Sequence, residues 1–260
     1  MQVVTIANEK GGVGKTTTTV NLAAALGLQQ KRVLVIDLDS QGHATQWLGV
    51  VKAQVPPERS AYAVLSGEAE IARTLIRTGE QNVVLCAAHP LLAKAALELG
   101  SNVEGLFVLR DALSADLPVD YVLIDCPPAK GAVVFNALIA ADLVVAPVLS
   151  QALSLEGLGE LGETVKRVRS RYSRHLPPPA ILINDYEGRS AADRQIQEYI
   201  RGQFGKEVFR AVLGRDAPLR ECFAAKESIF RYRRAARSAG VFREVAQELM
   251  ERLDAKETGN

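Results

Sequence analysis

The sequence predicts an α/β fold, a doubly wound and mostly parallel sheet with helices on both faces. Three short apolar runs carry this prediction: residues 3–7, 33–39 and 119–125. The first run is rich in β-branched residues and leads through a glycine-rich turn into apolar residues at helical spacing over 18–28. The other two runs end in carboxylates, which places these acids at the ligand-binding edge of an open α/β sheet.

Further elements follow from apolar spacing and from the prolines. Strands are expected at 83–87, 180–185 and 208–212, helices at 61–65, 70–77, 91–99, 105–113 and 241–253, and a long helix from Leu158 to the prolines at 177–179. In the last helix, Val241, Val245, Leu249 and Leu253 form one stripe, which we expect to pack on the core. With 260 residues the chain can bury one substantial core, so a single domain over residues 1–260 is expected.

The turn over residues 8–17 has the composition of a phosphate-binding loop. Gly11, Gly12 and Gly14 allow the backbone to wrap a polyphosphate, since a Cβ would block the tight turn or the close approach. Lys15 is placed to reach the β and γ phosphates, and the Thr16 hydroxyl is placed to ligate Mg²⁺. The nucleotide-binding residues expected here are Lys10, Gly11, Gly12, Val13, Gly14, Lys15, Thr16 and Thr17.

Aspartates end two of the predicted strands. Asp37 and Asp39 point the same way by the two-residue period of a strand. Asp125 ends an apolar run in the manner of a Walker B strand, whose carboxylate holds Mg²⁺ through water while the following loop senses the γ-phosphate. A nucleoside triphosphate with Mg²⁺ is therefore the expected ligand.

Other classes of protein are disfavoured by composition. Cys86, Cys126 and Cys222 are widely separated and form no C-x-x-C pair, so buried free thiols are expected rather than disulfides or a zinc site. No apolar run approaches the roughly 18 to 20 residues that cross a bilayer. Residues 1–3 enter a strand without the pattern of a signal peptide, so a cytoplasmic protein is expected.

The net charge of +1 conceals an asymmetry along the chain. Residues 163–243 hold 18 Lys/Arg against 9 Asp/Glu, whereas the rest of the chain holds 13 against 21. Such a basic segment is a candidate surface for an anionic partner such as nucleic acid, and a merely solvated face is the alternative.

The glycine loop departs from the ordinary pattern G-x-x-x-x-G-K-[ST] at two positions. Glu9 stands where that pattern has glycine, and a second lysine, Lys10, precedes the glycines. The resulting box, K-G-G-x-G-K-[ST], resembles the deviant Walker A box of the ParA/MinD family of P-loop NTPases. Segments 37–45 and 119–128 are also similar to that family, and the similarity extends over nearly the whole chain.

The resemblance implies specific roles within a two-subunit site. Lys10 would reach across a dimer to the partner's nucleotide, and Asp39 would orient or activate the attacking water. Asp37 would support the magnesium shell, and Asn184 would contact the adenine edge. On this basis the expected catalytic residues are Lys10, Lys15 and Asp39, and the expected metal-site residues are Thr16, Asp37 and Asp125.

The same resemblance implies contacts with DNA. In ParA-type members the arginine of a turn similar to 187–190 contacts DNA. Segment 214–221 departs from the family's P-R-N-x-R-L-S-E, because Pro218 replaces the second arginine. That role is expected to move to Arg220 or to the arginines that follow. The expected DNA-binding residues are Arg189, Arg215, Arg220, Arg231, Arg233, Arg234 and Arg237.

Taken together, the chain resembles a ParA-type partitioning ATPase of the short kind, which lacks an N-terminal helix-turn-helix domain. Such a protein is nucleoid-associated, forms an ATP-sandwich homodimer, binds DNA without sequence preference and hydrolyses ATP slowly. It segregates plasmid or chromosome DNA with a ParB-like activator. A MinD-like membrane-cycling regulator is one alternative, but the acidic C-terminal helix argues against stable membrane association. A ParA-like ATPase that positions a protein cargo is another.

Overall fold

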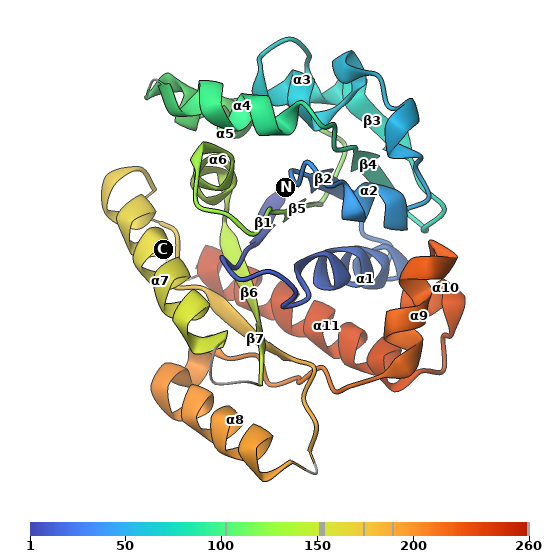
Figure 1. The fold of residues 1–260 in the computed structure, drawn as a ribbon, viewed down its shortest axis with the longest axis vertical. Coiled ribbons are helices and arrows are strands. Elements are labelled where there is room, and N and C mark those ends of the chain that lie inside the picture. Colours follow the sequence, from blue (N-terminus) through green and yellow to red (C-terminus); the bar gives the residue numbers. More distant parts are fainter. Residues whose placement is uncertain (102, 151–153, 174, 189, 259–260) are drawn as a thin grey trace.

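One central sheet organises the part of the chain that the structure describes, residues 1–101, 103–150, 154–173, 175–188 and 190–258 (Figure 1). The computed structural model places seven strands there in the order β3-β4-β2-β5-β1-β6-β7, with β3 antiparallel to β4 and every other pair parallel. The strands are β1 Gln2–Ile6, β2 Val33–Asp37, β3 Leu75–Arg77, β4 Val83–Cys86, β5 Tyr121–Asp125, β6 Leu143–Leu149 and β7 Ala180–Asn184.

Helices cover both faces of this sheet, and alternate strand residues point into two separate apolar cores. In β1, Val4 and Ile6 lie in the core with α1 and α11, whereas Val3 lies in the core with α3 to α7. This confirms the predicted doubly wound fold. The helices are α1 Lys15–Leu28, α2 His43–Trp47, α3 Ala61–Leu65, α4 Leu92–Glu98, α5 Val108–Ala112, α6 Ala132–Ala140, α7 Ser154–Arg171, α8 Ala191–Phe204, α9 Ala217–Ala225, α10 Ile229–Tyr232 and α11 Arg237–Thr258.

Strand register brings the expected site residues to one edge of the sheet. Asp125 at the end of β5 is the register partner of Ile6 in β1 on one side and of Asp37 in β2 on the other. Because these strands run parallel, the loop after β1 and the carboxylates that end β2 and β5 meet at the same edge. Backbone pairing therefore assembles the core of the site.

Two expected elements are wrong. The helix expected at 70–77 is a 3₁₀ turn, Ile71–Thr74, followed by the edge strand β3, because pairing with β4 overrides the local apolar spacing. In place of a strand at 208–212, the described chain has only the isolated bridge between Ile181 and Val208 nearby. The N–H of Phe209 donates to the Ile181 carbonyl at 2.8 Å, which fixes this segment beside β7 without a continuous ladder.

Several helical predictions hold and others are incomplete. The helices expected at 61–65 and 241–253 are confirmed as α3 and as part of α11. The region expected to be helical at 105–113 contains a 3₁₀ turn, Glu104–Leu106, before α5. No helix was expected at α2, α6, α8, α9 or α10. Further 3₁₀ turns lie at Lys52–Gln54, Pro57–Arg59, Leu99–Ser101 and Gly205–Glu207.

The C-terminal helix packs its apolar stripe on the core, as expected. Val245, Leu249 and Leu253 are buried, and α11 lies along α1 (Figure 1). The three cysteines are buried free thiols, which also confirms the prediction. Among the helices that the structure describes, none has the length and apolar character required to cross a bilayer.

Candidate active site

The loop between β1 and α1 adopts a backbone that requires glycine. Gly12 has φ +74° and Gly14 has φ +95°, both in the left-handed region that side chains with a Cβ rarely adopt. A Cβ on Gly14 would also overlap the side-chain amide of Asn184. Glycine at position 14 is therefore required both by its backbone angle and by its neighbour.

Two buried asparagines hold this loop in place. The Nδ2 of Asn184, at the end of β7, donates to the Val13 carbonyl at 2.8 Å. The Nδ2 of Asn8 donates to the Pro147 carbonyl at 2.8 Å, and its Oδ1 accepts from the Lys10 N–H at 2.9 Å. The structure thus places Asn184 directly against the loop, while its contact with adenine remains a prediction.

The lysine and the hydroxyl that open α1 face the Walker B carboxylate. Thr16 Oγ1 donates to Asp125 Oδ2 at 2.8 Å, and Thr19 Oγ1 donates to Asp125 Oδ1 at 3.1 Å. Lys15 is only 7% exposed, and its Nζ donates to the Lys10 carbonyl at 3.0 Å. A hydroxyl oxygen beside a carboxylate is a donor set that suits Mg²⁺, and an adjacent ammonium suits phosphate. The residues present therefore fit a magnesium–nucleotide complex.

The two aspartates after β2 have different surroundings. Asp37 is fully buried, and its Oδ2 accepts from the N–H and the Oγ1 of Thr45, each at 2.7 Å. Asp39 is partly exposed, and its Oδ1 accepts from the Gln41 N–H at 2.9 Å. Asp37 thus anchors α2 to the sheet, a contact that sequence reasoning missed. The expected roles of Asp37 at the metal and of Asp39 at the water remain predictions.

Burial perturbs the ionisable groups of this site. It raises the pKa of Asp125, with the charge of Asp37 as the next cause, and it also raises the pKa of Asp37. Burial lowers the pKa of Lys15, an effect that the charge of Asp125 opposes. Two buried carboxyl groups that resist ionisation together provide a strong reason to bind a cation.

An open cleft of about 410 Å³ adjoins the glycine loop. Its lining includes Gly12, Gly14 and Asn184 on the loop side, with Trp47 and Phe223 among the other residues. The two aromatic rings meet edge to face with centroids 5.2 Å apart. Aromatic and apolar walls beside a phosphate loop suit a planar base. Sequence reasoning missed both rings, because nothing in their local spacing connects α2 to α9.

The structure separates the arginines predicted to bind DNA. Arg215 and Arg220 both pair with Asp185 beside the cleft, at 3.3 and 2.9 Å. Arg231 pairs with Glu227 at 3.2 Å and lies 4.0 Å from the buried Glu80. The remaining described members are exposed, namely Arg233, Arg234 and Arg237. Arg189 lies outside the described residues. The arginines predicted to bind DNA therefore differ in their surroundings, because some of them pair with carboxylates of this chain.

Comparison with known proteins identifies the family. A family model described as "AAA domain" matches residues 1–177, and one described as "Cellulose biosynthesis protein BcsQ" matches residues 107–250. The chromosome partitioning protein ParA of Caulobacter vibrioides is 34% identical over 255 residues, which cover 97% of this chain and 95% of that protein. The sporulation initiation inhibitor protein Soj of Bacillus subtilis is 36% identical over 249 residues, which cover 95% of this chain and 98% of that protein. The chain belongs to the ParA/Soj family of ATPases.

A solved structure agrees with this assignment. Cobyrinic acid a,c-diamide synthase from Mycobacterium smegmatis, with bound ATP analogue and magnesium, is 31% identical and superposes with a TM-score of 0.82, covering 96% of this chain and 94% of that one. As a member of the ParA/Soj family, this chain is a P-loop ATPase that uses ATP and Mg²⁺. The glycine loop, Thr16 and Asp125 are the residues that fit these ligands.

The raised pKa of Asp125 predicts how stability depends on pH in protein free of nucleotide and metal. The folded chain retains a proton on Asp125 that the unfolded chain releases at lower pH. Stability should therefore fall as pH rises through the raised pKa. We expect Asp125→Asn to reduce the drop in melting temperature between about pH 6 and about pH 8.

The matched control is Asp111→Asn, at an exposed aspartate that pairs with Arg110. It should retain the wild-type pH dependence, and thermal unfolding followed by circular dichroism measures all three proteins. An equally steep drop in Asp125→Asn and in the wild type would show that Asp125 does not carry the effect.

Proposed function

We propose that this ATPase forms a dimer around two ATP molecules, binds DNA without sequence preference in that state, and releases it after slow hydrolysis. In this scheme it segregates plasmid or chromosome DNA with a ParB-like partner. The observation that carries the proposal is the placement of Lys10 at the start of the glycine loop, where its backbone is fixed from two sides. The Asn8 side chain accepts from its N–H, and Lys15 donates to its carbonyl.

The surroundings of Lys10 support a defined role for its side chain. Helix α7 packs closely on this peptide, since a Cβ on Gly157 would lie 3.2 Å from the Lys10 Cβ. Because the backbone of Lys10 is held in this way, its side chain starts from a fixed position at the edge of the site. We infer that Lys10 crosses to the phosphates bound by a second subunit, so that the nucleotide creates the dimer.

Hydrolysis requires neutralised phosphate charge and an oriented water. Lys15 and Lys10 supply positive charge, and the partly exposed Asp39 supplies a carboxylate that can orient water. When bound, Mg²⁺ neutralises phosphate charge. Activators that add a cation in comparable NTPases raise the rate by about 10³ to 10⁵. We therefore propose a slow basal rate that a ParB-like protein with a basic segment increases.

In this scheme, DNA binding depends on dimerisation, because a dimer carries two copies of the basic surface. If each subunit neutralises about four phosphates, a dimer makes about eight contacts. With a slope near −0.9 per contact, affinity would fall about 20,000-fold between about 50 and about 200 mM salt. The exposed Arg233 and Arg234 on the segment after α10 are the best-placed contributors, and Arg215, Arg220 and Arg231 contribute less because carboxylates already pair with them.

The alternatives differ in cargo or in target surface. A MinD-like membrane cycle would use a C-terminal amphipathic helix, but in α11 the apolar stripe is buried and Glu248 pairs with Arg210 and Arg252. This disfavours membrane binding. A protein cargo in place of DNA would use the same ATPase site, and a ParB-like reading frame beside the gene would favour DNA.

The dimer is tested with Lys10→Ala and a non-hydrolysable ATP analogue with Mg²⁺. Sedimentation velocity should show the wild type as a dimer and the variant as a monomer, because the variant lacks the charge that reaches the partner's phosphates. Lys94→Ala is the control, since this exposed lysine pairs with Glu98 within α4 at 3.2 Å. An unchanged dimer in Lys10→Ala would refute the sandwich.

DNA binding is tested with the double variant Arg233→Gln and Arg234→Gln. If each side chain contacts one phosphate, the dimer loses four contacts and the salt slope should decrease by about 3.6. The control replaces Arg73 and Arg110, exposed arginines in the first half of the chain, by Gln. Equal slopes in the two double variants, measured by fluorescence anisotropy, would place the DNA surface elsewhere.

A further inference from the structure

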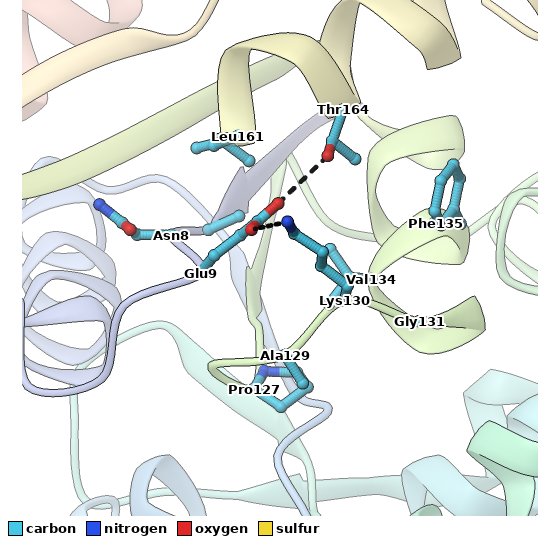
Figure 2. Close-up of a pocket in the computed structure, with 11 residues that line it drawn as sticks. Asn8, Glu9, Pro127, Ala129, Lys130, Gly131, Val134, Phe135, Leu161 and Thr164 are labelled. Carbon is cyan, nitrogen blue, oxygen red and sulfur yellow. Dashed lines mark hydrogen bonds and ion pairs between the residues drawn. The ribbon is translucent and has the colours of Figure 1, made fainter. Parts of the chain in front are cut away.

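A largely buried carboxylate, that of Glu9, stands at the position where the ordinary phosphate loop has glycine. The side chain of Glu9 is only 10% exposed, and it points toward Thr164 of α7 and Lys130 of the loop that follows β5 (Figure 2). A carboxylate in such surroundings needs charged or hydrogen-bonding partners, because burial without them is unfavourable. The family assignment alone gives this residue no role.

Glu9 connects three separate segments of the chain. Its Oε1 accepts from Thr164 Oγ1 in α7 at 3.1 Å, and its Oε2 lies 3.0 Å from Lys130 Nζ (Figure 2). Lys130 also pairs with Glu160 Oε2 in α7 at 3.3 Å. Hydrogen bonds to Glu9 first and then to Glu160 raise the pKa of Lys130. Burial first, and then contact with the Glu160 carboxyl, raise the pKa of Glu9, and Lys130 and Thr164 oppose this shift. The pair thus joins the glycine loop to the loop between β5 and α6.

Two further contacts join the same two loops. A Cβ on Gly11 would lie 3.9 Å from the Pro128 Cβ, and the Cys126 N–H donates to the Ile6 carbonyl at 3.3 Å. The loop after Asp125 therefore lies beside the segment that leads into the glycine loop and beside Gly11. Glu9 and Lys130 make the charged contact between them, and Glu9 is the residue directly before Lys10.

We propose that Glu9 and Lys130 are positioning residues for ATP hydrolysis, which together fix the peptide of Lys10 relative to the loop after Asp125. A displacement of Lys130 with that loop would move Glu9 and hence the backbone of Lys10. The pair also transmits such a displacement to α7 through Thr164 and Glu160. This inference goes beyond the proposed function and concerns the ATPase reaction itself, so it holds whether or not the protein binds DNA.

The pair is tested by a double-mutant cycle on the full-length protein. Glu9→Gln and Lys130→Met should each lower kcat about 3- to 10-fold with KM for ATP nearly unchanged, because the phosphate-binding backbone is retained while the reacting geometry is less well fixed. The double variant should lose no more than the worse single variant, because either change already removes the ion pair.

Two comparisons separate positioning from a general loss of structure. Lys94→Met, at an exposed lysine that pairs with Glu98, should retain wild-type kcat, KM and melting temperature. Glu9→Gln keeps the size of the side chain and an oxygen for Thr164, so it should fold even if Lys130→Met does not. Single-variant losses that multiply in the double variant, or a wild-type kcat in Glu9→Gln, would each overturn the proposal.

Discussion

The left-handed backbone at Gly12 and Gly14 is the constraint on which the rest of this structure depends. These two residues turn the chain from β1 into α1 within a few positions, so that consecutive N–H groups face outward at the start of a helix. Asn184 occupies the space where a Cβ of residue 14 would lie, and it fixes the loop from β7. The sheet order then places β5 next to β1, so the carboxylate of Asp125 reaches the first turn of α1.

The electrostatics of the site are arranged for ligands rather than for the stability of the protein alone. Asp37 and Asp125 are register partners on neighbouring strands, and both are buried. A pair of acids in such surroundings destabilises the fold when both are ionised, and a bound cation relieves that repulsion. The site therefore combines a locally unfavourable arrangement of charges with a function that requires it.

Local sequence patterns predicted the parts of the structure in which one segment determines its own conformation. The strand, loop and helix from Gln2 to Leu28 are of this kind, as is the strand that ends in Asp125. The edge strand β3 was missed because its conformation depends on β4. The contacts between Asp37 and Thr45 and between Glu9 and Lys130 join residues whose proximity only the fold creates. The same holds for the carboxylates that pair with Arg215 and Arg220.

The most direct test of the central constraint is the affinity of Gly14→Ala for ATP with Mg²⁺, measured by isothermal titration calorimetry. Backbone strain of about 1 to 3 kcal/mol at this residue, together with the overlap with Asn184, should weaken binding by about 10- to 100-fold. Gly159→Ala is the matched control, because its Cβ would meet open space on α7 and affinity should be retained. A folded Gly14→Ala variant that binds ATP as tightly as the control would contradict the account.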